Sequence, residues 1–249
     1  MRALVEIVCC SADDCAVAAN AGAHRIELCA ALEVGGLTPS VGVLRAAKAA
    51  TSLPIMAMVR PRAAGFYYSK REFESMLLDV LTFVDEGADG VVLGVLNSDG
   101  SLDVERCQEL VRAAGSAQKV CHRCFDVTPD PFGAIETLIE LGFTRVLTSG
   151  QKANCMDGLD LIRSLVERAN GRIEILPGGG LRADDIPALI SRTGVDQVHL
   201  APFGVVEDLS TRGNPEIRYA GIAMPKEAMF SRIDGSAVGE IVRISSKLA

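Results

Sequence analysis

The sequence alternates short apolar segments with longer amphipathic ones, and this alternation constrains the fold more than any other feature. Eight segments have the length and aliphatic content of buried strands: residues 3–8, 24–29, 54–59, 90–94, 119–125, 144–149, 172–177 and 196–201. Several of the intervening segments begin at Ser, Asp or Pro and end at Gly, as capped helices do. Strands that alternate with helices pair in parallel, because each return crossover needs a helix.

Eight such units in 249 residues predict an α/β fold, a TIM (β/α)8 barrel, as one domain over residues 1–249. An open doubly wound sheet is disfavoured because no GxGxxG motif follows the first strand. No Pro/Ser-rich linker divides the chain. The segment after about residue 205 fits the repeat poorly and contains the loop RGNPEIRYAG.

Net charge and hydropathy limit the classes of binding partner and the cellular locations that are expected for this chain. The formal net charge of −7 argues against nucleic acid or an anionic membrane as a partner. No apolar run reaches the roughly 18 residues that a membrane span needs. The first residues, MRALVEIVCC, lack the long apolar region of a signal peptide, so we expect a cytoplasmic protein.

Eight cysteines in such a chain are expected to be free thiols packed as small apolar groups. The one CxxC motif, Cys121 to Cys124, falls inside a predicted strand. Residues three apart on a strand point to opposite faces, which argues against a redox dithiol there.

The second predicted strand carries Arg25, Glu27 and Cys29 on one face and aliphatic side chains on the other. In a barrel, the polar face points inward, and the active sites of such barrels lie at the carboxyl ends of the strands. The same alternation selects further residues at these ends: Glu6, Arg60, Arg62, His122, Cys124, Asp126 and His199. Structural ion pairs are one interpretation, above all for Glu6 with Arg25. For Glu27, Arg60, His122 and His199 the convergence at one end favours a functional site.

Three loops at the same end are candidates for binding an anion. Gly178, Gly179 and Gly180 follow the seventh strand and free the backbone to present N–H groups, although a tight turn alone also requires Gly. Thr148 and Ser149 offer hydroxyls after the sixth strand. Arg60 and Arg62 flank a proline after the third; solvated arginines are the alternative there.

Five motifs in order, IELCAALEVGGLTPS, VRPRAAGFYYS, HRCFD, GFTRVLTSG and ILPGGG, resemble the CutC family, named for copper homeostasis. The resemblance runs from about residue 3 to residue 200. It implies a TIM barrel, a cytosolic location, self-association as a dimer or tetramer, and a proposed role in copper homeostasis with Cu(I) bound by cysteine.

The chain departs from the family pattern at the expected copper ligands. The family has Glu-x-Cys on its first strand, where this chain has Glu6-Ile-Val8 followed by Cys9 and Cys10. The second-strand thiol, Cys29, is retained. We therefore expect Cu(I) at Cys29, with Cys9, Cys10 or Cys124 as partner, and among these we predict Cys9. A one-residue shift turns a strand side chain to the other face, which weighs against Cys9.

Catalysis is the alternative function, since the Glu, Arg and His residues at the strand ends are all present: Glu27, Arg60, His122 and His199. As an enzyme, the protein would perform lyase or isomerase chemistry on a small anionic or phosphorylated metabolite. Glu27 or Asp126 would be the base and His122 the acid or electrophile. The anion would be held by a set of rim residues: Arg60, Arg62, Arg123, Thr148, Ser149, Gly178, Gly179, Gly180 and His199. A scaffold without a small ligand is a third interpretation.

Overall fold

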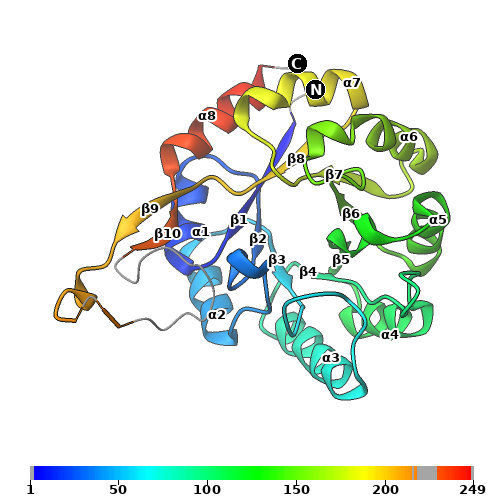
Figure 1. Ribbon diagram of the computed structural model, residues 1–249, viewed down its shortest axis with the longest axis horizontal. Coiled ribbons are helices and arrows are strands. Elements are labelled where there is room, and N and C mark those ends of the chain that lie inside the picture. The colour runs from blue at the N-terminus through cyan, green and yellow to red at the C-terminus, as the bar shows by residue number, and fades with distance from the viewer. Residues whose placement is uncertain (1–2, 215, 218–228, 248–249) are drawn as a thin grey trace.

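Eight parallel strands form the centre of the fold, as the sequence predicts. The structure, a computed structural model, describes residues 3–214, 216–217 and 229–247. The strands pair in the order β7-β6-β5-β4-β3-β2-β1-β8, and β8 lies beside β7, so that the barrel is nearly closed (Figure 1). Their bounds are β1 (Leu4–Cys9), β2 (Arg25–Leu28), β3 (Ile55–Met58), β4 (Gly90–Leu93), β5 (Gln118–Cys121), β6 (Arg145–Thr148), β7 (Glu174–Pro177) and β8 (Gln197–Leu200).

Helices form a ring around the strands (Figure 1). They are α1 (Ala12–Asn20), α2 (Val41–Ala50), α3 (Lys70–Asp85), α4 (Val104–Ala114), α5 (Pro131–Leu141), α6 (Leu159–Ala169), α7 (Ile186–Thr193) and α8 (Gly235–Ser246). Local sequence sets their ends. Ser69 begins α3 with a capping box to Glu72, and Gly142 ends α5 in the left-handed region. No described helix is long and apolar enough to cross a membrane.

The fifth strand is shorter than predicted. It ends at Cys121, and the chain then enters a 3-10 helix, η2 (Arg123–Val127). A helical turn breaks the two-residue alternation of a strand. The expectation that His122, Cys124 and Asp126 share one face is therefore wrong: His122 lines the barrel mouth, Cys124 is buried in the outer core, and Asp126 turns toward the loop after β6.

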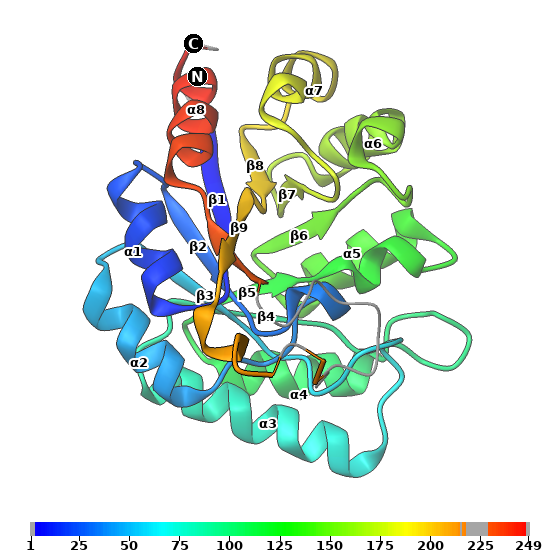
Figure 2. The same ribbon diagram turned by 60° about the vertical axis from the view of Figure 1, so that its left-hand side comes forward.

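The segment after residue 200 leaves the barrel repeat. Strands β9 (Phe203–Glu207) and β10 (Met229–Ile233) form a separate two-stranded antiparallel sheet beside α1, outside the ring of helices (Figures 1 and 2). Helix α8 then returns to pack against β1 between α1 and α7. Part of the RGNPEIRYAG loop, residues 215 and 218–221, lies outside the described residues.

A polar layer fills the barrel near the amino ends of its strands. Arg25 forms a buried ion pair with Glu6 and donates a hydrogen bond to Gln197 at 2.7 Å. Arg145 donates to the same Gln197 oxygen at 3.2 Å and pairs with Glu174 at 2.6 Å. Buried charges persist only when they are paired, so these contacts account for Glu6 and Arg25 as structural groups. The pocket lies farther along the strands.

Candidate functional site

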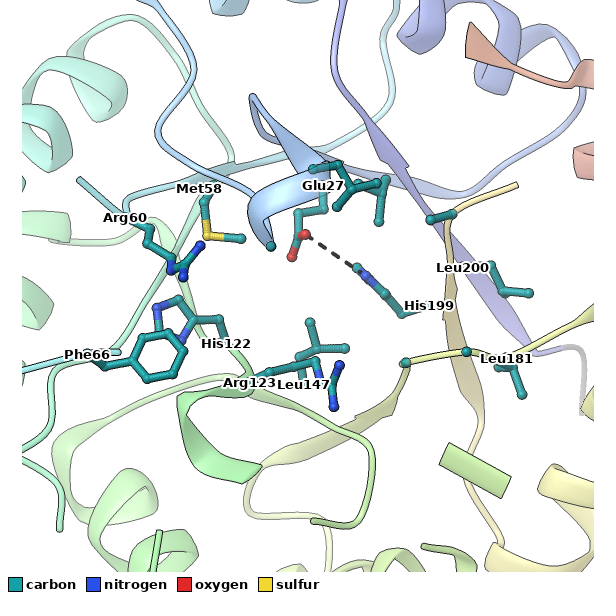
Figure 3. A pocket seen from close by; sticks show the side chains of 16 residues that line it. Glu27, Met58, Arg60, Phe66, His122, Arg123, Leu147, Leu181, His199 and Leu200 are labelled. Atoms are coloured by element: carbon teal, nitrogen blue, oxygen red, sulfur yellow. Dashed lines mark ion pairs between the residues drawn. The ribbon is translucent and has the colours of Figure 1, made fainter. Parts of the chain in front are cut away.

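A pocket of about 380 Å³ opens at the carboxyl ends of the strands (Figure 3). Its walls come from seven of the eight strands or the segments that follow them, so segments from nearly the whole chain build it. The lining residues are Val8, Glu27, Leu32, Gly35, Met58, Arg60, Phe66, His122, Arg123, Leu147, Gly179, Gly180, Leu181, His199, Leu200 and Ala201. A volume of this size suits a small metabolite.

Glu27 and His199 point toward one another across the pocket (Figure 3). Oε1 of Glu27 lies 3.9 Å from Nε2 of His199, while Nδ1 of His199 lies 2.7 Å from Oε1 of Glu6. Glu6 stands beside both Arg25 and His199 in the strand register, which explains how one carboxylate contacts both. Because that carboxylate accepts from Nδ1–H, the other ring nitrogen of His199 faces Glu27.

These groups perturb one another's protonation. Burial opposes ionisation of Glu6, but Arg25 and His199 outweigh it and lower its pKa to about 2. Burial raises the pKa of Glu27 to about 7, against the attraction of His199. Burial lowers the pKa of His199, but Glu27 and Glu6 outweigh this and the net shift is upward. The pocket floor thus holds an ionised Glu6, while the pKa values of Glu27 and His199 are both shifted upward, toward the protonated forms.

His122 is held as a neutral hydrogen-bond donor at the opposite wall. Its Nδ1 accepts from the amide of Cys124 at 3.2 Å, so the neutral ring carries its proton on Nε2. Burial and the charge of Arg60 lower its pKa to about 3. Its ring contacts Phe66 with centroids 4.8 Å apart. The Nε2 atom is buried and has no hydrogen-bond partner among the described residues.

Arg60 also lines the pocket, and its guanidinium is anchored by backbone. It donates to the carbonyls of Val34 and Gly36 at 3.0 and 2.8 Å, and to that of Ala64 at 2.7 Å. The Cζ atom of Arg60 lies over the Phe66 ring, 5.4 Å from the ring centroid. Arg62, predicted beside it, instead turns outward, pairs with Glu72 at 2.5 Å and is absent from the pocket wall. The Pro61 turn therefore separates the two cations.

Arg123, which was expected at the rim together with Arg62, lines the pocket. Asp126 pairs with its Nε at 2.8 Å, and Ser149 Oγ accepts from its Nη2 at 2.7 Å. Asp126 also accepts from Thr148 Oγ1 at 2.5 Å and from the amides of Ser149 and Gln151. Asp126, Thr148 and Ser149 do not line the pocket. They form a support that orients Arg123, which corrects the expected direct roles of all three.

The glycine loop after β7 contributes two of its three residues to the pocket. Gly178 donates to the carbonyl of Thr148 and packs against His199 beneath the surface. Gly179 and Gly180 line the pocket and have φ values of +102° and +72°. Only glycine adopts such angles without strain, so both the turn and the open backbone surface depend on these residues.

Two thiols meet beside the pocket. The Sγ atoms of Cys10 and Cys29 lie 3.8 Å apart; Cys10 is half-buried and Cys29 is buried. Their contact lowers the pKa of Cys10 and, with burial, raises that of Cys29. Cys9, the expected partner, lies on the outer face of β1 with its thiol beside Cys15. Cys10 replaces it because the chain turns out of the strand after Cys9.

The two thiols of the CxxC motif lie on the same side of the chain at the end of β5, and not on opposite faces of a strand as predicted. The thiols of Cys121 and Cys124 lie 3.6 Å apart, because η2 brings Cys124 back toward the end of β5. Both are fully buried in the outer core. The expectation that they point to opposite faces is therefore wrong, although their burial keeps them from solvent. All eight cysteines are free thiols.

Two donor sets are candidates for a metal ion. In the described part of the chain, one group of three carboxylate or imidazole residues has its ligand atoms within 4.8 Å of one another: Glu6, Glu27 and His199. Glu6 already accepts from Arg25 and His199, which leaves one carboxylate and one imidazole, donors typical of borderline or hard ions. The thiols of Cys10 and Cys29, with Met58 in the same apolar cluster, are soft donors that fit Cu(I).

Several residues of the pocket wall are not among those predicted from the sequence. Leu147 shares a face of β6 with Arg145, so the alternation rule would have found it. Phe66 lies in a loop, and Leu32 and Gly35 lie in and just after the short 3-10 helix η1 (Leu32–Val34), where no periodicity indicates direction. Their positions follow from the tertiary structure alone.

The chain matches the model of the CutC family over residues 3–204. A CutC family protein of Treponema denticola is 49% identical over 98% of each chain. A human protein named copper homeostasis protein cutC homolog is 42% identical, over 79% of this chain and 72% of its own. A crystal structure of a CutC protein from Streptococcus agalactiae aligns with a TM-score of 0.76 and 36% identity, over 79% of this chain and 97% of that one.

Proposed function

Because this chain belongs to the CutC family, we propose that it acts in copper homeostasis, the role stated in the name of its human relative, by binding Cu(I) between Cys10 and Cys29. The observation that carries the proposal is the 3.8 Å contact between these two thiols at the barrel mouth. Soft thiolates select Cu(I), which accepts low coordination numbers. The eight free thiols are consistent with a reducing cytoplasm as the place of action.

The spacing of the thiols suits one shared ion. Two thiolates that bind one metal ion at roughly 2.3 Å lie roughly 3.8–4.0 Å apart when further ligands bend the S–metal–S angle to between the tetrahedral and the trigonal value. Met58 belongs to the apolar cluster that contains Cys29 and against which Cys10 packs, so a thioether is near the pair. Cys10 is half-buried, which leaves a route for the ion from solvent.

The test is Cu(I) binding under anaerobic, reducing conditions, in competition with a chromogenic Cu(I) chelator. We expect one ion per chain in the wild type and none in Cys29→Ser or Cys10→Ser. Cys9→Ala is the matched control, because it removes a neighbouring thiol that points away from the pair. Thermal unfolding of each variant establishes that it is folded. Unchanged stoichiometry in both serine variants would refute the thiol pair as the copper site.

Catalysis in the pocket is a second candidate function, favoured by Oε2 of Glu27. This oxygen is buried on the pocket wall and has no hydrogen-bond partner among the described residues. A carboxylate oxygen aimed into a cavity beside His199 is placed to take a proton from a bound small molecule. His122 Nε2–H would polarise a carbonyl, giving isomerase- or lyase-type chemistry on an anionic metabolite.

Exchange of carbon-bound hydrogen with solvent tests this second function without knowledge of the product. Small phosphorylated carbonyl compounds are incubated with the protein in D2O and followed by proton NMR. We expect loss of a C–H signal with the wild type and none with Glu27→Gln. Equal exchange by both proteins would remove Glu27 from the role of base.

A further inference from the structure

We infer that the rim of the pocket is a binding site for the phosphoryl group of a small hydroxylated metabolite, held by Arg123 and the amides of Gly179, Gly180 and Leu181. The inference goes beyond copper binding and concerns binding alone, so it stands whether or not the pocket catalyses a reaction. Four features of the site support it.

The three amides are available to a ligand. Gly178 N–H donates to Thr148, and the carbonyl of Gly179 accepts from Cys155 at 2.8 Å, which fastens the loop to its neighbours. The next N–H groups, of Gly179, Gly180 and Leu181, have no acceptor within the described ranges, and all three residues line the pocket. Successive free N–H groups on a glycine turn form a concave surface suited to anions.

The lack of side chains on the glycines also lets Arg123 and Asn154 lie directly against this loop. A Cβ on Gly179 would lie 3.1 Å from the Arg123 guanidinium, and one on Gly180 would lie 2.8 Å from the side-chain nitrogen of Asn154. Arg123 therefore packs directly over the glycine turn. Asp126 and Ser149 hold its guanidinium in this orientation. A preformed fork of N–H donors beside free amides matches the oxygens of a phosphate.

The pocket carries positive charge that the protein does not neutralise. Arg60 is 6% exposed, and the hydrogen-bond partners of its guanidinium are three backbone carbonyls. No carboxylate forms an ion pair with Arg60 in the part of the chain that is described. A buried cation without a carboxylate partner favours an anionic ligand.

The inner wall points to hydroxyl groups on the same ligand. His122 Nε2–H is a donor without an acceptor, and Oε2 of Glu27 is an acceptor without a donor; both side chains are about 3% exposed. Buried polar atoms are normally satisfied, so a ligand that completes both is expected. A hydroxyl both donates and accepts, and the cavity of about 380 Å³ has room for a few hydroxylated carbons below a phosphate.

The experiment follows backbone amides of the wild type by NMR during titration with inorganic phosphate and with glycerol 3-phosphate, against sodium chloride at equal ionic strength. We expect saturable shifts at Gly179, Gly180 and Leu181 with both phosphates and none with chloride. Glycerol 3-phosphate should bind at least several-fold more tightly than inorganic phosphate. The Arg123→Ala variant should lose roughly 10-fold or more in affinity, because a charge-assisted contact is lost.

Two controls isolate the site. Arg62→Ala removes an arginine that follows the same strand but turns away from the pocket, and it should bind phosphate as the wild type does. Cys29→Ser should also bind normally, which separates this site from the copper site. Absent or non-saturating shifts at the three amides would overturn the inference. An equal loss of phosphate affinity in Arg62→Ala and Arg123→Ala would also overturn it. Equal affinity for inorganic phosphate and glycerol 3-phosphate would contradict the part of the inference that gives the ligand hydroxyl groups.

Discussion

Nδ1 of His199 lies 2.7 Å from Glu6, whereas its Nε2 lies 3.9 Å from Glu27. The imidazole therefore joins two layers of the barrel. Its inner nitrogen is fixed by a carboxylate that Arg25 also binds, and its outer nitrogen faces the pocket without a direct hydrogen bond to Glu27. A histidine oriented from behind in this way presents a defined nitrogen to whatever enters the cavity.

Glu6 is predicted to be essential for stability. Glu6→Gln leaves the buried guanidinium of Arg25 without its charged partner, which should lower the free energy of unfolding by about 3–5 kcal/mol. Urea denaturation at pH 7 measures the change. Glu86→Gln, which breaks the pair with the largely exposed side chain of Arg45, is the control and should have little effect. Similar losses in both variants would contradict the importance of burial.

His122 is predicted to make stability fall as the solution becomes acidic. Its pKa is about 3 in the folded chain and near 6.5 when unfolded, so below pH 6.5 the unfolded state binds the additional proton. His122 therefore leaves the free energy of unfolding unchanged above pH 6.5 and lowers it progressively from pH 6.5 toward pH 3. Relative to His122→Gln, the wild type should lose roughly 2 kcal/mol between pH 6.5 and 5. Denaturation curves that stay parallel over this range would show that His122 titrates normally.

Cys10 is predicted to be the first thiol to react. It is half-buried and has a lowered pKa, whereas the other seven cysteines are buried. Reactivity depends on exposed thiolate, so native protein treated briefly with iodoacetamide should gain one adduct at Cys10. Peptide mass spectrometry locates it, and Cys10→Ser should remain unmodified. Early adducts at buried positions would indicate that the barrel opens more readily than this packing allows.

Gly180 is predicted to tolerate no side chain. Its φ of +72° and the close approach of Asn154 should make Gly180→Ala less stable by about 1–3 kcal/mol. The same variant should bind phosphate more weakly, since the amides it repositions belong to the proposed site. Gly65→Ala, at a position with open space and no positive φ, is the control for thermal unfolding. An unaltered melting temperature in Gly180→Ala would show that the loop can adjust.

Self-association as a dimer or tetramer stays a prediction, based on the family resemblance. Sedimentation velocity at several protein concentrations measures it. A mass of about 26 kDa per particle throughout would show a monomer, since one chain has a mass of 26.3 kDa.

The barrel and the residues inside its strands were predictable from sequence, because side-chain direction in a strand depends only on position parity. Glu6, Arg25, Glu27 and His199 face inward for this reason. The residues just beyond the strands were not predictable in the same way. Arg62, Cys9 and Asp126 were each expected at the pocket, and each points elsewhere.

The sequence by itself determined the eight βα units, the polar inner face of β2 and the glycine loop after β7. These are local properties, encoded by hydrophobic periodicity and by backbone angles that only glycine adopts freely. Only the tertiary structure decided that Cys10 rather than Cys9 meets Cys29, that Arg123 rather than Arg62 covers the glycine turn, and that Asp126 supports Arg123. The physical reason is that a strand's alternation ends with the strand, and beyond it the direction of a side chain is set by contacts with segments far away in the chain.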